Sequence, residues 1–158
     1  MNVNIKILNE NAKVPTYGSS CSAGADLYAC LDSEVFILPH ETVMIPTGIA
    51  MEIPDGYVGL VYARSGLALK MGLAPANKVG VIDSDYRGEI MVALYNHSDL
   101  ERKILPGERI AQIVITPYVR ANFSVVSVLS DTERGNGGFG STGMKWVYMS
   151  CLFCFANW

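Results

Sequence analysis

The segment "IAMEIPDGYVGLVYA" (residues 49–63) decides the fold class. Its large apolar residues Ile49, Met51 and Ile53 alternate with smaller or polar ones, and the triplet Pro-Asp-Gly at 54–56 precedes a second apolar run. Alternation with a period of two indicates a strand with one buried face, and Pro, Asp and Gly are favoured in tight turns. The segment therefore predicts two short strands joined by a turn.

The same pattern of short apolar runs separated by Gly and Pro extends along the chain. The further predicted strands lie at 3–7, 25–29, 34–38, 42–46, 80–82, 89–96, 109–117 and 122–129. Only residues 65–72, "SGLALKMG", suggest a helical turn. Because no helices alternate with the strands, we expect an all-β fold, a distorted jelly-roll barrel or sandwich.

Composition limits the classes of partner. The chain has 158 residues, half of them hydrophobic, and a net charge of −3, which suits one domain with a core. No polybasic surface is expected, so neither a nucleic-acid polymer nor a membrane is predicted as a partner, whereas a small polyanion needs only a few cations. The N-terminus lacks the pattern of a signal peptide, and no apolar stretch of about twenty residues occurs, which predicts a cytoplasmic location.

Candidate chemistry is narrowed by the scarcity of histidine. His40 and His97 both lie in predicted exposed loops, which argues against a histidine metal site and a Ser-His-Asp triad. The pair Cys151 and Cys154 has no second pair nearby and is a weak metal signal. If the chain is an enzyme, a carboxylate must serve as its base.

Two C-terminal segments do not fit a plain sandwich. Residues 135–143, "GNGGFGSTG", contain five glycines and have little reason to keep one shape alone. They match G-x-G-x-x-G by letter, but no βαβ unit surrounds them, so a dinucleotide fold is not expected. The apolar tail, 144–158, holds both tryptophans and is read as a segment without function, a packed strand or helix, or an interfacial anchor.

Five ordered blocks then carry a family resemblance. They are "AGADLYA" (23–29), "ARSGLALK" (63–70), "NKVGVIDSDYRGEI" (77–90), "GERIAQIV" (107–114) and "RGNGGFGSTG" (134–143). With these blocks the chain resembles the trimeric dUTPases over residues 1–143. The resemblance implies a β jelly-roll domain at 1–130, a glycine-rich arm at 131–143 that closes over the site, and an atypical tail of unknown role at 144–158.

The resemblance assigns the third block to the base and sugar of dUTP. In the family this block is a β-hairpin whose backbone reads the uracil edge, and a tyrosine matching Tyr86 stacks beneath the sugar and excludes a 2′-hydroxyl. Asp83 matches the carboxylate that contacts the 3′-hydroxyl and activates the attacking water. Asp85 and Arg87 are interpreted as structural. The remaining positions that match the lining are Asn77, Val81, Ile82 and Met91.

Other blocks match the residues that bind the triphosphate. The expected phosphate contacts in the second and fourth blocks are Arg64, Ser65, Gly66 and Gln112. Asp26 matches the residue that holds water on a Mg²⁺ ion, which the substrate phosphates bind directly. The arm would place an aromatic ring on uracil and polar groups on the γ-phosphate, through Arg134, Phe139, Gly140, Ser141 and Thr142.

The resemblance thus implies a homotrimer with sites shared between subunits that hydrolyses dUTP to dUMP and diphosphate with Mg²⁺. That activity keeps uracil out of DNA and supplies dUMP for dTMP synthesis. Two alternatives remain open at this stage: an enzyme resembling dCTP deaminase, and a noncatalytic module that binds dUTP for regulation.

Overall fold

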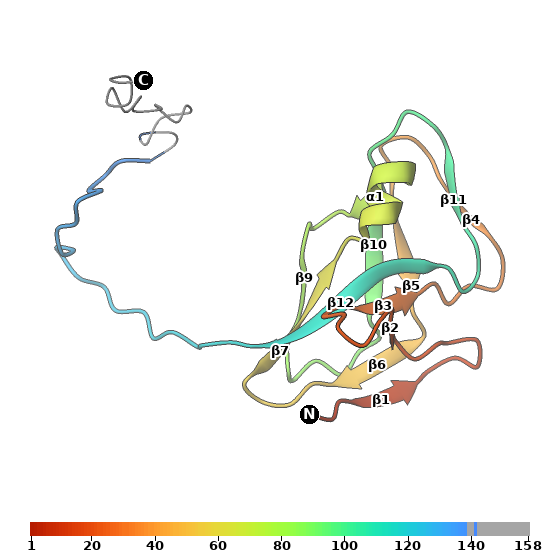
Figure 1. Ribbon diagram of the computed structural model, residues 1–158, viewed down its shortest axis with the longest axis horizontal. Helices are drawn as coiled ribbons and strands as arrows, with labels where there is room; N and C mark the ends of the chain where they lie inside the picture. The colour runs from red at the N-terminus through yellow and green to blue at the C-terminus, as the bar shows by residue number, and fades with distance from the viewer. Residues whose placement is uncertain (139–140, 142–158) are drawn as a thin grey trace, which may run out of the picture. The chain divides into compact units, whose positions relative to one another are not determined.

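The computed structural model describes residues 1–138 and 141, and the chain divides into two compact units, Met1–Arg120 and Ala121–Trp158. The helix and the strands of the described residues all lie in the first unit (Figure 1). In chain order they are β1 (Asn4–Ile7), β2 (Thr16–Tyr17), β3 (Ala25–Tyr28), β4 (Val35–Ile37), β5 (Thr42–Pro46), β6 (Ile49–Glu52), β7 (Tyr57–Tyr62), α1 (Ser65–Met71), β8 (Leu73–Pro75), β9 (Gly80–Ile82), β10 (Met91–Asn96), β11 (Arg102–Ile104) and β12 (Arg109–Pro117).

The largest sheet is built around β12. Its strand order is β2-β3-β12-β7-β9, and all its pairings are antiparallel. Gln112 on β12 is aligned with Asp26 on β3 and with Tyr62 on β7. Figure 1 shows β12 running beside β3 and β7. This register brings three strands that are distant in sequence to one place.

Smaller sheets complete the first unit. A three-stranded sheet has the order β5-β10-β8, and β1-β6 and β11-β4 form antiparallel pairs. Alternating strand residues form one core, as the sequence pattern predicts. The all-β expectation is therefore confirmed. The largest fully buried apolar side chains are Leu27, Ile37, Ile45, Ile49, Leu73, Ile90, Val92, Leu94, Ile104 and Ile110.

One predicted strand is wrong. Residues 122–129 form no strand, and Phe123, Val125 and Val128 are exposed. Because a strand needs a partner for its backbone N–H and C=O groups, alternation in sequence is not sufficient to form one. Among the described residues, no segment pairs with 122–129.

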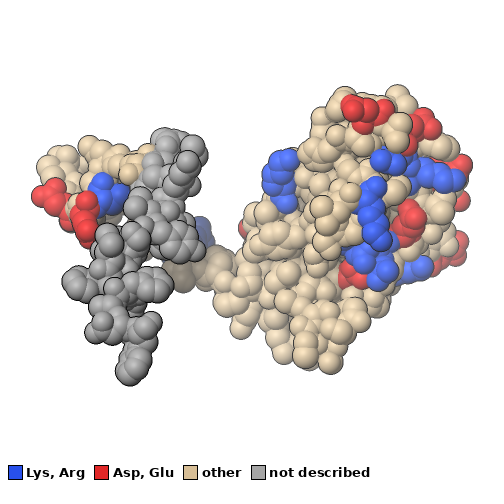
Figure 2. Space-filling view, turned by 45° about the horizontal axis from the view of Figure 1, so that its top comes forward, with Lys and Arg blue, Asp and Glu red and all other residues tan. Residues whose placement is uncertain are grey.

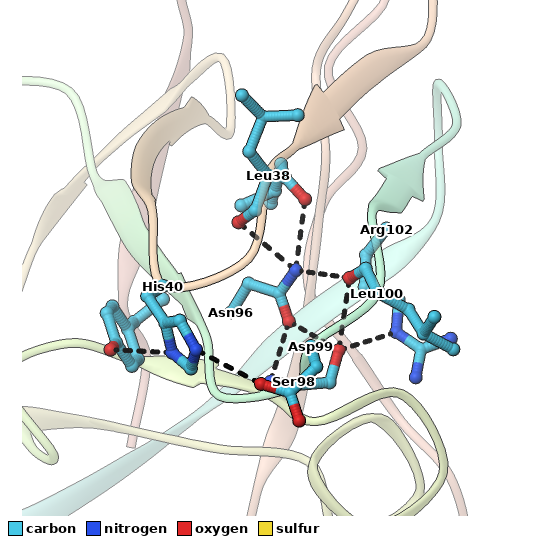
Figure 3. A network of polar contacts seen from close by, with 9 residues as sticks. Leu38, His40, Asn96, Ser98, Asp99, Leu100 and Arg102 are labelled. Atoms are coloured by element: carbon cyan, nitrogen blue, oxygen red, sulfur yellow. Dashed lines mark hydrogen bonds and ion pairs between the residues drawn. The ribbon is translucent and has the colours of Figure 1, made fainter.

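Asn96, at the end of β10, is fully buried, and its side chain joins two segments, 37–38 and 98–100 (Figure 3). Its Nδ2 donates to the carbonyl oxygens of Ile37, Leu38 and Leu100 at 3.0, 3.2 and 2.8 Å. Its Oδ1 accepts from the backbone N–H and the hydroxyl of Ser98 at 3.0 and 2.8 Å. The amide thus satisfies backbone groups that would otherwise be buried without partners.

The same segment anchors the end of α1. Gly72, which follows the helix, has φ of 69°, and its carbonyl oxygen accepts from the N–H of His97 at 2.8 Å. A Cβ at Gly72 would lie 3.1 Å from the Cβ of Ser98. Glycine is therefore required both by the left-handed backbone and by the close approach. Through these contacts β10 fixes the position of the helix.

We predict that Asn96→Ala lowers the free energy of unfolding by about 3 kcal/mol, because several buried backbone groups lose their partners. Urea unfolding at fixed protein concentration measures the change. His97→Ala serves as the control, since that side chain is exposed on the same segment. Equal stability of the two variants would contradict the structural role given to Asn96.

Candidate active site

A hollow of about 480 Å³ opens on the central sheet beside the start of α1. It brings together five of the predicted phosphate and metal residues, which come from β3, α1 with its preceding turn, and β12. These residues are Asp26, Arg64, Ser65, Gly66 and Gln112. The rest of its lining is Gly18, Ser22, Ala23, Gly24, Tyr62, Arg109 and Val114. We call this hollow the phosphate pocket.

A β-bulge in β12 sets which side chains reach the phosphate pocket. Arg109 is aligned with Tyr28, but Ala111 is aligned with Leu27, so one extra residue, Ile110, lies on β12. A bulge of this kind reverses the side-chain alternation locally. Arg109 and Gln112 therefore both line the pocket although they are three residues apart, while Ile110 is buried in the core.

Asp26 is the buried charge of the pocket, with only 8% of its surface exposed. Its Oδ1 accepts from Nε of Arg64 at 2.6 Å, and its Oδ2 accepts from Nη1 of Arg109 at 3.2 Å. The short bond to Arg64 is a strong charge-assisted one, and the longer bond orients the half-exposed Arg109 beside it. With one carboxylate between two guanidinium groups, the cluster has a local charge of about +1, which suits an anionic ligand.

Gln112 is held by close packing. Its Nε2 donates to the carbonyl oxygen of Ala63 at 2.9 Å, which leaves the second amide hydrogen free for a ligand. A Cβ at Gly24 would collide with the Oε1 of Gln112. Glycine is thus required at position 24, directly before β3, because the Gln112 side chain packs against its backbone.

The predicted base and sugar residues form a second group, around the loop from β9 to β10. Val81, Asp83, Tyr86 and Met91 are exposed, and Asn77 lies in the exposed turn before β9. None of the residues from 77 to 91 is among those that line the phosphate pocket. The part of the chain that the structure describes therefore presents two separate sets of site residues.

The third block departs from the hairpin that the resemblance implies. β9 pairs with β7 in the large sheet, whereas β10 pairs with β5 and β8 in the three-stranded sheet. Ile82 lies opposite Gly59, whose missing side chain allows β9 to approach closely. The loop at 83–90 therefore crosses between sheets, and Asp83 is its first residue after β9.

Only part of the glycine-rich arm can be described. Arg134 and Ser141 belong to the second unit, where the carbonyl oxygen of Arg134 accepts from the N–H of Gly137 at 3.0 Å. Phe139, Gly140 and Thr142 lie outside the described residues, as do the tail at 144–158 and its Cys-x-x-Cys motif. The roles expected for these residues stay predictions.

Arg109 was not predicted as a site residue. It lies in the block "GERIAQIV". The feature of the sequence that could have indicated it is a basic residue directly before an apolar run. With Arg64 and Lys70 it also lines a neighbouring hollow of about 620 Å³. In Figure 2 basic side chains of the first unit gather in a band with acidic ones alongside. Such local clustering fits a small polyanion better than a nucleic-acid polymer.

The donor set agrees with a magnesium ion that the phosphates of a ligand bind directly. Within residues 1–138 and 141, no group of three His, Cys, Asp or Glu side chains could hold a metal. Asp26 accepts one arginine bond at each oxygen, and each oxygen keeps a further lone pair for a water molecule. Since Mg²⁺ commonly retains several waters, one nearby carboxylate is sufficient.

Cys30 is a buried thiol that the site does not use. Burial raises its pKa, and the carboxylates of Glu89 and Asp32 raise it further. A Cβ at Gly48, whose φ is 70°, would come within 2.7 Å of its Sγ. The thiol is therefore protonated at neutral pH and unreactive.

A family model described as dUTPase matches residues 10–143. The chain is 50% identical over 145 residues to the deoxyuridine 5'-triphosphate nucleotidohydrolase of Hydrogenobaculum sp. (strain Y04AAS1), covering 92% of this chain and 100% of that protein. It is 47% identical over 146 residues to the protein of the same name from Burkholderia ambifaria (strain MC40-6), covering 90% and 99%.

Solved structures are similar as well. A dUTPase variant of Staphylococcus bacteriophage 80alpha, with dUpNHpp, superposes with a TM-score of 0.82 at 30% identity, covering 90% of this chain and 98% of that one. A dUTPase variant from phage phi11 of S. aureus gives a TM-score of 0.75 at 25% identity, covering 83% and 100%. Its description concerns the coordination of a structural Mg(II) ion.

Within the described residues, no helix is both long and apolar enough to cross a membrane.

We predict that Arg109→Ala weakens binding of inorganic diphosphate about tenfold or more, because one charge-assisted donor is lost from the phosphate pocket. Isothermal titration calorimetry at fixed ionic strength measures the affinity. Lys103→Ala is the matched control: it removes the same charge from the ion pair with Glu34, on β11 and outside the pocket lining. The same affinity in both variants would remove Arg109 from the site.

Proposed function

The chain belongs to the dUTPase family, and we propose that it hydrolyses dUTP to dUMP and diphosphate, with the triphosphate bound in the phosphate pocket. One observation carries the assignment of that pocket: a buried Asp26 holds Arg64 and Arg109 side by side next to the hydroxyl of Ser65 and the amide of Gln112. The activity keeps uracil out of DNA and supplies dUMP for dTMP synthesis.

The pocket offers different donors to different phosphate oxygens. The Arg64 and Arg109 guanidinium groups provide charged donors, and the Ser65 hydroxyl and the backbone N–H of Gly66, which line the same pocket, provide neutral ones. The free amide hydrogen of Gln112 is assigned to the α-phosphate. Donors that are fixed before the substrate arrives stabilise the charge that builds up during the reaction without reorganisation.

Base and sugar are assigned to the second group of residues. Backbone groups of Val81 and Ile82, with Asn77 and Met91, read the uracil edge, and cytosine is rejected because its amino donor leaves a buried donor without an acceptor. Tyr86 packs beneath the deoxyribose and excludes a 2′-hydroxyl by steric conflict. Its ring is already fixed, because the phenol hydroxyl donates to the carbonyl oxygen of Glu89 at 3.0 Å.

Asp83 is the proposed base. Its carboxylate accepts a proton from a water molecule, whose oxygen forms a bond to the α-phosphorus while the bond from that phosphorus to the diphosphate oxygen breaks in line. Because the carboxylate follows β9 directly, the ladder from β9 to β7 limits its movement. Most of the rate enhancement then comes from orientation and from neutralised phosphate charge.

Mg²⁺ is the proposed cofactor. Asp26 would hold it through a water molecule, and the ion would supply charge neutralisation at the phosphates. The protein side chains keep their own tasks: Asp26 fixes both arginines, and these orient the phosphate chain.

We assign the complete site to a homotrimer, in which the phosphate pocket of one chain meets the 77–91 loop of another. Two features support this assembly. The loop residues are exposed on the first unit and do not line its phosphate pocket. Apolar side chains that would gain from burial in a subunit contact occur from 119 to 129, and Val119, Phe123 and Val125 are more than nine-tenths exposed.

The arm and the cellular location complete the proposal. Arg134, Phe139, Gly140, Ser141 and Thr142 are assigned to closure over the bound nucleotide, with the aromatic ring on uracil and the polar groups on the γ-phosphate. Closure of such a segment excludes bulk water from the reacting phosphorus. The proposed location is the cytoplasm.

We predict that Asp83→Asn lowers kcat for dUTP by a factor of about 10² to 10⁴, because an amide cannot accept the proton from water. Binding of the imido analogue dUpNHpp should change little, since the substitution keeps the shape of the side chain. Diphosphate release and calorimetric titration measure the two quantities. Near-normal turnover would exclude Asp83 as the base.

A further inference from the structure

The loop at 83–90 contains an arginine that the proposed mechanism does not use. Nη1 of Arg87 donates to the carbonyl oxygen of Ser84 at 2.6 Å and to that of Tyr86 at 3.0 Å. Its Nη2 lies 3.6 Å from Oε1 of Glu52, at the end of β6. One guanidinium therefore joins the middle of the loop to a strand of another sheet.

Glu52 is itself held in place. Its Oε2 accepts from Nδ2 of Asn4 at 2.7 Å, and the two residues are aligned in the β1-β6 ladder. We call Asn4, Glu52 and Arg87 the loop brace. The three side chains line one hollow of about 350 Å³, so they share one face of the molecule.

The two ends of the loop have separate anchors. β9 pairs with β7 at the first end. At the second end, Oε1 of Glu89 accepts from the N–H of Gly48 at 2.7 Å, and the hydroxyl of Thr47 donates to the carbonyl oxygen of Ile90 at 2.5 Å. The backbone in the middle of the loop is held by Arg87 and by one turn bond, from the N–H of Tyr86 to the carbonyl oxygen of Asp83 at 3.2 Å, while the Tyr86 hydroxyl adds its own bond to the carbonyl oxygen of Glu89.

We propose that Arg87 is a positioning residue, which sets the carboxylate of Asp83 and the ring of Tyr86 by tying the carbonyl groups between them. The inference rests on the proposed function of these two residues. Charge-assisted bonds to two carbonyl oxygens restrict the turn more than neutral bonds would. Glu52 acts through Arg87: their ion pair is half exposed and long, so it orients the guanidinium and contributes little stability by itself.

We expect a large effect from substitution of Arg87, which contacts the loop directly, and a smaller one from Glu52, which acts through Arg87. Arg87→Ala lowers kcat for dUTP about tenfold to a hundredfold, because displacement of a reacting group by about 1 Å has effects of that size. KM changes less, since the phosphate pocket is unaltered. The preference for dUTP over UTP falls as well, because the backbone of Tyr86 loses its bond from Arg87 and the ring is then held only by its hydroxyl bond to Glu89. Arg87→Lys restores part of the loss, and Glu52→Gln causes a smaller loss in the same direction.

A matched ion pair on other strands provides the control. Lys103 on β11 lies 3.0 Å from Glu34, and both side chains are about half exposed, as Arg87 and Glu52 are. Lys103→Ala and Glu34→Gln should leave kcat and the preference for dUTP unchanged. If they reduce both as much as Arg87→Ala does, general surface charge explains the effect and the proposal is wrong.

Hydrogen exchange gives a readout that does not need activity. The amide of Tyr86 should exchange faster in Arg87→Ala than in the wild-type chain and at the wild-type rate in Lys103→Ala, because only the first variant loosens the turn. If the Tyr86 amide of Arg87→Ala exchanges at the wild-type rate, Arg87 does not hold the turn and the proposal is wrong. If the wild-type protein does not hydrolyse dUTP, the proposed function is wrong, and the exchange experiment still decides whether Arg87 holds the turn. If the wild-type protein hydrolyses dUTP and Arg87→Ala keeps the same preference for dUTP over UTP, only the inference about Arg87 is wrong.

Discussion

The ion pairs of Asp26 are the interaction on which the candidate site depends. They join three segments that are far apart in sequence: β3, the turn before α1, and β12. A buried carboxylate is stable only when its charge is compensated, so the sheet must bring Arg64 and Arg109 to the same place. The bulge at Ile110 is the local distortion that allows β12 to do this. In the proposed function, fold and phosphate recognition are therefore linked through one side chain.

Division of the site between two surfaces is the second consequence of the fold. The large sheet supplies cations and amide donors, while the loop between β9 and β10 supplies the carboxylate and the tyrosine. Under the proposed function, this arrangement makes binding of the phosphates separable from recognition of base and sugar. It also explains why the loop requires its own anchors at Glu89, Thr47 and Arg87.

The sequence predicted most of the strands, and the reasons for its failures are physical. Alternation identified β6, β7 and β12 because each has one face in the core. β2, β8 and β11 have two or three residues each and were not predicted, whereas the equally short β4 and β9 were, because these two lie within longer apolar runs. Residues 122–129 alternate as a strand does, yet pairing depends on a partner that alternation cannot reveal. The blocks predicted Asp26 and Arg64 as site residues, and the structure places the two in contact, but the contact of Arg109 depends on a bulge, which has no signature in the apolar pattern.

The central claim, that one site uses the phosphate pocket of one chain and the loop of another, can be tested by mixing two inactive variants. Arg64→Ala damages only the phosphate pocket, and Asp83→Asn damages only the loop. When the two chains are unfolded, mixed and refolded together, some assemblies combine an intact pocket with an intact loop from a different chain. The account predicts that the mixture hydrolyses dUTP well above the sum of the separately refolded variants. A mixture no more active than that sum would contradict it.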